Sequence, residues 1–187
     1  MPSSSEPVRS RLIIALLVGA VAIAALTPSA GGAPSAGSVR AKATSWAESQ
    51  LGHREVGTSN CSSRINKWER DMGFKVPPCK VWCGALVHQA FLRAGVKLSP
   101  RIINPDKSYS DAVAGKRKLR RISISQIRRG DIVFYLFRTD MRASHLGIAR
   151  GKPSGGKLRT VEGNTSHAVR FKTRGTQYIV LAARVVA

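Results

Sequence analysis

The segment CGALVHQAFLRAG, residues 83–95, is the clearest helical stretch of this 187-residue sequence. Its apolar side chains recur three and four positions apart, the spacing of one face of an α-helix, and the final glycine suits the position after a helix. The residues of this face are Leu86, Val87, Ala90, Phe91 and Ala94. Because Pro77 and Pro78 lie in the preceding loop, the sequence predicts a helix over 83–94 that begins at or beside Cys83.

Two shorter helices are expected upstream of this segment. One covers 43–51, with Thr44 or Ser45 as N-cap and a glutamate three or four residues on. The other covers 62–72 and ends at Gly73, which has the conformational freedom that a helix terminus requires.

The pattern changes downstream of the helices. The stretch 99–129 is polar and basic, and it is followed by short apolar runs between turn residues. Strands are expected over 132–137, 145–149, 158–162 and 178–186. Helices first, then strands joined by short turns, are typical of an α+β domain in which N-terminal helices pack on an antiparallel sheet.

The N-terminus has the pattern of a secretory signal peptide. Two arginines precede an uncharged apolar run over 12–26, and small residues and prolines follow. The run is short for a membrane-spanning helix, which needs about 20 apolar residues, although an uncleaved membrane anchor is the alternative. We therefore expect a signal peptide and cleavage region over 1–36, a short linker over 37–42 and one domain over 43–187, secreted or associated with the cell wall.

The charge of the chain predicts an anionic partner. Lysine and arginine number 31 against 10 acidic residues, a formal net charge of +21, and such a field concentrates polyanions. Export favours anionic cell-wall polymers over nucleic acid, and the basic run 116–121, interpreted as a solvated loop, lacks the aromatics that stack on bases. The alternative is that the charge only keeps an exported protein soluble.

The cysteines predict a disulfide and one free thiol. There are three, and outside the cytoplasm an odd cysteine is either reactive or bonded to another chain. Pairing of Cys61 with Cys79 would staple a modest loop and leave Cys83 free. The alternative is that Cys83 forms the bond and a different cysteine stays free.

Cys83 and His145 are the candidate nucleophile and base. A thiol at a helix N-terminus feels the positive end of the helix dipole, which favours the reactive thiolate; the alternative is a buried structural cysteine. His145 opens an apolar strand directly after a loop, whereas His88 lies five positions along the helix of Cys83 and points away from it. His145 would otherwise be an ordinary surface histidine.

The motif Glu162-Gly163-Asn164 supplies candidate partners for the histidine. Strand side chains alternate between faces, so Glu162 and Asn164 are expected on one face. If their strand lies beside that of His145, a carboxylate and an amide reach the imidazole and orient it. The alternative is an ordinary turn, in which Gly-Asn is common.

Four motifs in this order resemble the CHAP family of cysteine- and histidine-dependent amidohydrolases and peptidases, a branch of the papain-like and NlpC-like hydrolases. They are WCGALV (82–87), RGDIV (129–133), HLGI (145–148) and TVEGNT (160–165). The resemblance runs from about residue 43 to the end of the chain and implies a papain-like, NlpC-like CHAP fold. By position it implies that Cys83 is the nucleophile and His145 the general base. It also implies that Glu162, assisted by Asn164, orients His145, and we assign Trp82 to substrate binding.

The resemblance implies a hydrolase that cleaves amide bonds of peptidoglycan, either as an N-acetylmuramoyl-L-alanine amidase or as an endopeptidase. Some phage-type members bind calcium through an acidic loop before the cysteine, but residues 75–80 contain no carboxylate. We therefore expect no metal. We also expect no cofactor and a monomeric protein. Two alternatives remain: a basic module that binds cell walls or nucleic acid without catalysis, and an inactive relative that keeps only the fold.

Overall fold

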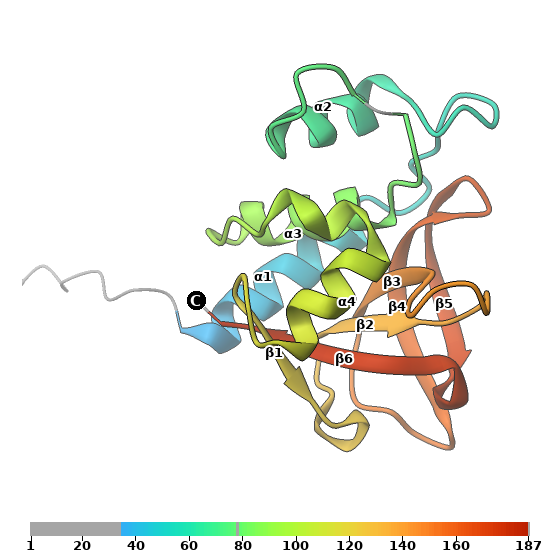
Figure 1. Ribbon diagram of the computed structural model, residues 1–187. Coiled ribbons are helices and arrows are strands. Elements are labelled where there is room, and N and C mark those ends of the chain that lie inside the picture. The colour runs from blue at the N-terminus through green and yellow to red at the C-terminus, as the bar shows by residue number, and fades with distance from the viewer. Residues whose placement is uncertain (1–34, 78, 187) are drawn as a thin grey trace, which may run out of the picture. The chain divides into compact units, whose positions relative to one another are not determined.

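The computed structural model describes residues 35–77 and 79–186. Within these residues, four helices and a six-stranded antiparallel sheet form an α+β domain, which confirms the predicted fold class. Helix α3 lies between α2 and the sheet (Figure 1). The helices are α1 Ala36–Ser49, α2 Ser63–Asp71, α3 Cys83–Arg93 and α4 Pro105–Val113, with short 3₁₀ turns η1 Pro100–Ile103, η2 Ile124–Gln126 and η3 Thr176–Tyr178. The strands are β1 Leu119–Ile122, β2 Ile132–Tyr135, β3 His145–Ala149, β4 Lys157–Thr165, β5 Ala168–Gly175 and β6 Ile179–Val185.

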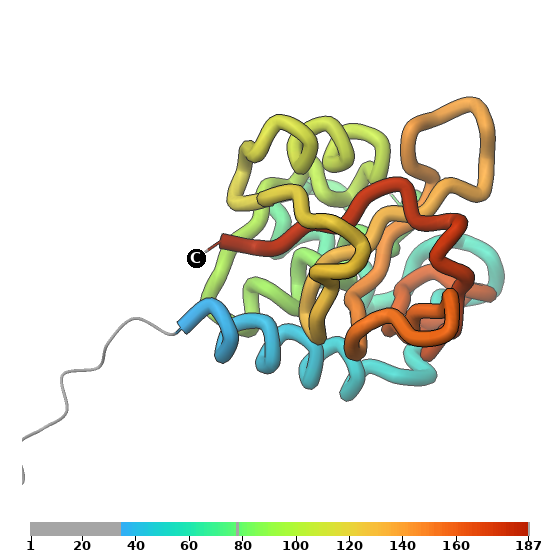
Figure 2. The backbone as a smooth tube through the Cα atoms, turned by 90° about the horizontal axis from the view of Figure 1, so that it is seen from below, coloured from blue at the N-terminus to red at the C-terminus, as the bar shows by residue number. Residues whose placement is uncertain are grey.

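The sheet buries side chains on both faces. Its strands run in the order β1-β6-β2-β3-β4-β5. The main core lies between the helices and the facing side chains of β2, β3, β4 and β6, and a smaller cluster around Val133, Tyr135 and Leu158 covers the other face. Figures 1 and 2 both place the start of α1 near the end of β6. Within the described residues no helix has the length and apolar character to cross a membrane.

The predicted helix over 83–94 is confirmed as α3, which is buried along most of its length. Its first turn packs tightly against η1, because a Cβ atom at Gly84 would overlap the carbonyl oxygen of Ile102. The glycine is therefore required for this contact, and the contact sets the position of the helix N-terminus. β3 has the predicted bounds, 145–149.

The N-terminal boundary was predicted wrongly. The segment 37–42, expected to be a linker, forms the first half of α1, and Val39 is buried in the core. The N-cap is Ser35, whose hydroxyl accepts a hydrogen bond from Ser38 N (3.2 Å). Thr44 lies inside the helix, where its hydroxyl donates to the carbonyl of Arg40. The predicted signal peptide falls almost wholly on residues outside the described part of the chain.

Three elements in the basic parts of the sequence were not predicted. Helix α4 begins at Pro105, and its N-cap is Asn104, whose side chain accepts a hydrogen bond from Lys107 N (3.0 Å). The run 116–121, interpreted as a solvated loop, is partly the strand β1, which pairs with the end of β6. Strand β5 pairs with β4 and contains two arginines and a lysine, so it lacks the apolar alternation that marks a strand.

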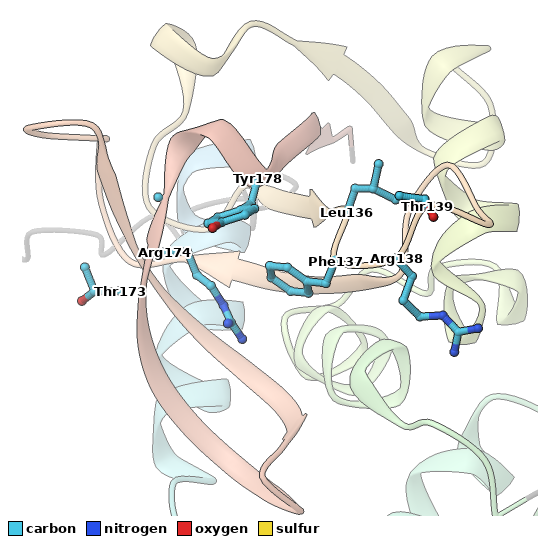
Figure 3. Close-up of a pocket in the computed structure, with 8 residues that line it drawn as sticks. Leu136, Phe137, Arg138, Thr139, Thr173, Arg174 and Tyr178 are labelled. Carbon is cyan, nitrogen blue, oxygen red and sulfur yellow. The ribbon is translucent and has the colours of Figure 1, made fainter.

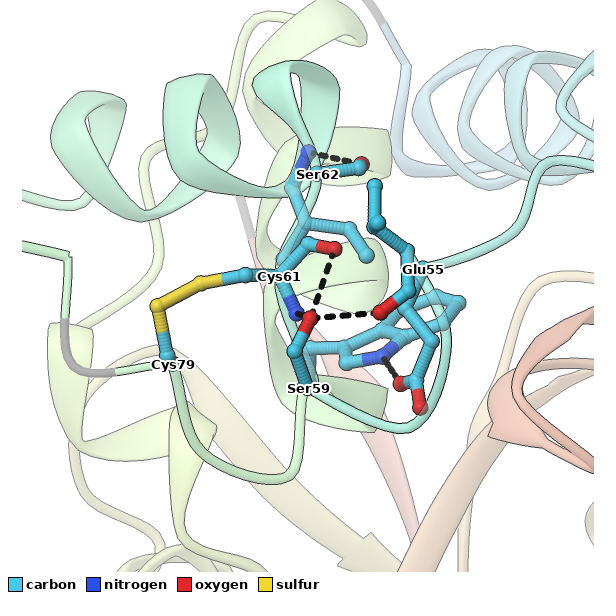
Figure 4. The surroundings of a disulfide bond; sticks show 8 residues. Glu55, Ser59, Cys61, Ser62 and Cys79 are labelled. Carbon is cyan, nitrogen blue, oxygen red and sulfur yellow. Dashed lines mark hydrogen bonds between the residues drawn. A yellow bond between two sulfur atoms is a disulfide. The ribbon is translucent and has the colours of Figure 1, made fainter.

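Cys61 and Cys79 form a disulfide with a Cα–Cα distance of 5.0 Å, and Cys83 is the free cysteine (Figure 4). The bond joins the loop before α2 to the loop that leads into α3. It therefore anchors the chain only four residues before Cys83.

Removal of this disulfide is expected to destabilise the domain. A cross-link that closes a loop of about 15 residues contributes about 3 kcal/mol, so the double variant Cys61→Ser with Cys79→Ser should lose about that much free energy of unfolding in urea. The intact mass should rise by about 2 Da when the wild type is reduced, since two thiols form. An unchanged mass after reduction would show that the bond is not formed.

Candidate active site

Cys83 is the first residue of α3 and is buried. The residue before it, Trp82, is the N-cap, and within the described residues no side-chain hydrogen bond caps this helix. The N–H of Leu86 donates to the carbonyl of Trp82 (3.2 Å). The N–H groups of the first helical turn have no acceptor within the helix, so they are free to bind a negatively charged oxygen near the sulfur.

His145 opens β3, the strand that pairs with β4, and it lines one cavity of about 360 Å³ together with Cys83. His145 Nε2 lies 3.0 Å from Glu162 Oε2. The structure therefore brings Cys83, His145 and Glu162, the three residues predicted to act together, into one part of the molecule.

Glu162 is fully buried and surrounded by hydrogen-bond donors. Besides His145, its partners are Thr160 Oγ1 (2.6 Å), Thr165 Oγ1 (3.1 Å), Arg174 Nε (3.1 Å) and Arg174 Nη2 (2.6 Å). Because buried charges are costly unless they are paired and hydrogen-bonded, these donors hold the carboxylate ionised in one orientation.

The same contacts fix the charges of the pair. Burial by itself lowers the pKa of His145, but its hydrogen bonds and charge interactions with Cys83 and Glu162 raise that pKa to about 9. Burial by itself raises the pKa of Glu162, but His145 and Arg174 lower it to about 2. At neutral pH, His145 is therefore an imidazolium beside an ionised glutamate.

Asn164 does not occupy the place predicted for it. A β-bulge shifts the register between Glu162 and Thr165, and Asn164 has a left-handed backbone with φ of 56°. The extra residue breaks the alternation of faces, so Thr165, not Asn164, lies beside His145, with Oγ1 3.4 Å from Nε2. The amide of Asn164 instead donates to Asn60 Oδ1 (3.1 Å).

Trp82, assigned to substrate binding, is fully buried, so that assignment is wrong for this conformation. Its indole Nε1 donates to Glu55 Oε2 (2.9 Å), and Glu55 Oε1 lies 2.6 Å from His167 Nδ1. A Cβ atom at Gly163 would lie 2.9 Å from the Trp82 ring. The indole therefore packs the start of α3 against the end of β4, which brings Cys83 close to the strand of Glu162.

Sequence reasoning missed Thr160, Thr165, Arg174 and Gly147. A Cβ atom at Gly147 would lie 2.7 Å from Glu162 Cγ, so glycine leaves room there for the glutamate. Recognition of 168–175 as a strand after the Glu-Gly-Asn motif would have placed Arg170, not Arg174, opposite Glu162. Thr160 was visible as the residue two positions before Glu162, on the same face of the strand.

Two larger cavities adjoin the one at Cys83. One of about 550 Å³ shares Phe137, Arg138 and Arg174 with it (Figure 3). The other, of about 800 Å³, shares Val81, Arg138 and Ser144. The cavity that contains Cys83 therefore shares lining residues with both larger cavities. Among the described residues, no group of three or more His, Cys, Asp and Glu side chains is arranged to hold a metal ion.

The raised pKa of His145 predicts the basic limit of any activity that needs its proton. The value of kcat/KM should fall as pH rises through about 9, because the free protein then loses the imidazolium. The free energy of unfolding should also depend on pH through His145 and Glu162. The contribution of His145 is present below pH 6.5 and is lost as pH rises through about 9. The contribution of Glu162 is present above 4.5 and lost as pH falls through about 2. A basic limb below pH 7 in a plot of kcat/KM against pH would contradict the arrangement.

No protein-family model and no curated protein matches the chain. Among solved structures, the peptidoglycan hydrolase RipB from Mycobacterium tuberculosis matches with a TM-score of 0.51 and 16% identity, over 81% of this chain and 67% of RipB. The resuscitation promoting factor interacting protein RipA, in two variants mutated at a histidine and at a cysteine, matches with a TM-score of 0.50 and 18% and 19% identity. These matches cover 80% of this chain, which spans 63% of the RipA chains. At these identities the likeness is one of fold, and it supports the predicted α+β architecture of N-terminal helices packed on an antiparallel sheet.

Proposed function

We propose that this chain is a cysteine hydrolase that cleaves amide bonds of peptidoglycan. The observation that carries the proposal is the cavity shared by Cys83 and His145, with a buried glutamate behind the imidazole. This is the arrangement of nucleophile, base and orienting group that acyl transfer uses on unrelated folds. The similar fold of RipB, which is a peptidoglycan hydrolase, supports this choice of substrate.

In the proposed reaction the Cys83 thiolate attacks the amide carbonyl carbon, and the carbonyl electrons move to the oxygen. The N–H groups of the first turn of α3 stabilise this oxyanion. His145 then protonates the leaving nitrogen, the C–N bond breaks, and a thioester to Cys83 remains. The now neutral His145 takes a proton from water, and the resulting hydroxide attacks the thioester. The C–S bond breaks, which restores the thiolate–imidazolium pair.

Glu162 is proposed to orient the imidazole and to stabilise its positive charge throughout the cycle. Its contact with Nε2 leaves Nδ1 for proton exchange with the sulfur and the substrate. Because its pKa is near 2, Glu162 stays ionised over the whole working range and does not itself carry the proton.

We also propose that the protein acts outside the cytoplasm, at the cell wall. The disulfide favours an oxidising compartment, and the net charge of +21 favours anionic wall polymers as binding partners.

Binding to isolated cell walls is expected to weaken steeply with salt. Interactions between exposed charges are screened over about 10 Å at 0.1 M salt and about 3 Å at 1 M. Co-sedimentation with walls should therefore fall across this range, and salt-insensitive retention would rule out charge as the source of affinity.

The proposal is tested by digestion of purified peptidoglycan with the chain from residue 35 onward, followed by mass spectrometry of the soluble products. The new termini distinguish the two activities, because an amidase frees the peptide from muramic acid whereas an endopeptidase cuts within the peptide. Wall-bound, folded protein that releases no fragment from several wall types would favour the alternative, a binding module without catalysis.

A further inference from the structure

Arg174, on β5, binds the carboxylate of Glu162 with two hydrogen bonds. Nε donates to Oε1 (3.1 Å) and Nη2 donates to Oε2 (2.6 Å). The glutamate side chain is fully buried and that of the arginine is 23% exposed. Paired contacts of this kind fix both oxygens of a carboxylate, which a single donor cannot do.

The contact does not follow from strand pairing alone. In the β4–β5 register Glu162 lies opposite Arg170, which is exposed, whereas Arg174 lies opposite Leu158. Arg174 therefore reaches along the sheet to a carboxylate that already has another arginine opposite it. This makes Arg170 a natural control for Arg174, with the same charge on the same strand.

The guanidinium of Arg174 also lies near aromatic rings. It lies 4.7 Å from the ring centroid of Phe137 and 5.8 Å from that of Tyr135, and Figure 3 shows Phe137 and Arg174 converging from the segment after β2 and from β5. Arg174 also lines the cavity that contains Cys83 and His145. Its position is thus fixed between the glutamate and the wall of the reaction cavity.

We propose that Arg174 is a positioning residue that acts as the fourth member of the site. It locks the Glu162 carboxylate with Oε2 toward His145 and offsets part of its charge. The catalytic meaning of this role rests on the proposed function, but the Arg174–Glu162–His145 coupling is a physical property that can be measured without turnover.

The charged and titratable groups around His145 determine the sign of the effect. Cys83 faces it from α3, Glu162 from β4 and Tyr135 from β2, while Arg174 and Arg138 line the same cavity. Arg174 and the imidazolium share one carboxylate, so each cation weakens the hold of Glu162 on the other. Loss of the arginine charge should therefore raise the pKa of His145 further.

The test is an NMR pH titration of His145 in the wild type and in three variants, with its signal assigned from a His145→Gln spectrum. Arg174→Met should raise the pKa of His145 by about 1. Arg174→Lys, which keeps the charge, should leave it close to the wild-type value, as should the control Arg170→Met. An unchanged titration in Arg174→Met, or an equal change in Arg170→Met, would overturn the proposal.

Kinetics separate positioning from simple stabilisation. Arg174→Met should lower kcat by about 10- to 100-fold with little change in KM, and it should move the basic limb of the pH profile upward by about one pH unit. Arg174→Lys should keep the wild-type pH profile but lose part of kcat, since one ammonium cannot bind both oxygens. If Arg174→Met does not fold, Arg174→Lys decides, because wild-type kcat in that variant would contradict positioning by the paired contact.

The His145 titration and the digestion of peptidoglycan test the role of Arg174 and the proposed function separately. A shifted His145 titration in a protein that cleaves no peptidoglycan would retain the coupling and reject the proposed function. Cleavage with unshifted titration and an unshifted profile would retain the function and reject the role of Arg174.

Discussion

Replacement of Cys83 by alanine is expected to abolish peptidoglycan hydrolysis, with the rate falling by about 10⁴-fold or more. The sulfur is the only group in the proposed cycle that bonds to the substrate, and alanine offers no atom for that bond. Fold and wall binding should persist, because Cys83 is not part of the disulfide and alanine fits its buried position. The measurement is the release of soluble fragments by matched amounts of wild type and Cys83→Ala.

Two controls make this prediction decisive. Urea unfolding and co-sedimentation with walls show whether the variant is folded and bound, so that lost hydrolysis reports chemistry alone. Serine at position 83 keeps an oxygen nucleophile of similar size and should also be nearly inactive, because a hydroxyl ionises far less readily than a thiol. Fragment release by Cys83→Ala at the wild-type rate would reject the thiol mechanism.

Replacement of Glu162 by glutamine is expected to have the second-largest effect, on both activity and stability. The variant leaves the cations of His145 and Arg174 next to a neutral amide in a buried site. Breaking a buried ion pair costs about 3–5 kcal/mol, and loss of the orienting carboxylate in a catalytic triad lowers kcat by about 10⁴-fold. Urea unfolding and peptidoglycan digestion measure the two losses.

Asn164→Ala is the matched control for this prediction. Asn164 lies two residues from Glu162, but its amide contacts Asn60 and not the imidazole. Asn164 does line the cavity of Cys83 and His145, so its loss should lower kcat to some extent, but far less than Glu162→Gln, and it should leave the pH profile in place. If Asn164→Ala reduced kcat as much as Glu162→Gln, the sequence-based role of Asn164 would be restored and the orientation seen in the structure would not be the active one.

The site could be predicted where local pattern and tertiary structure agree. The spacing of Leu86, Ala90 and Phe91 marks a buried helix whose first residue is Cys83, and the apolar run after His145 marks a strand with the observed bounds. Proximity of β3 and β4 followed from the short connection between them, so Glu162 was placed beside His145 correctly.

The sequence-based predictions failed where the position of a side chain is determined by one backbone irregularity or by a contact between residues far apart in the sequence. The alternation rule placed Asn164 next to Glu162 on one face, and the bulge at Asn164 moved Thr165 there instead. Trp82 is adjacent to the nucleophile in sequence, yet its partner Glu55 lies 27 residues away and holds it in the core. Arg174 was missed because its strand is polar and its role depends on a carboxylate on another strand.

The predicted boundaries of helices and strands also failed where tertiary contacts determine the structure. The segment 37–42 has small and polar residues that suit a linker, but burial of Val39 against the core stabilises it as helix. Strand β1 is short and basic, so its sequence does not indicate a strand. Pairing with β6 supplies the backbone hydrogen bonds that stabilise it. Tertiary contacts of this kind outweigh local propensity.

The most direct test of the central claim is to trap the acyl-enzyme. The wild-type protein is mixed with a soluble peptidoglycan fragment, and the reaction is quenched in acid within the first turnover. The protein is then digested, and the masses of its peptides are measured by mass spectrometry. The proposed mechanism predicts that the peptide containing Cys83 gains the mass of the acyl part of the fragment, with no gain in Cys83→Ala. Release of product with the Cys83 peptide unmodified during a burst, or an adduct on another residue, would contradict Cys83 as the nucleophile.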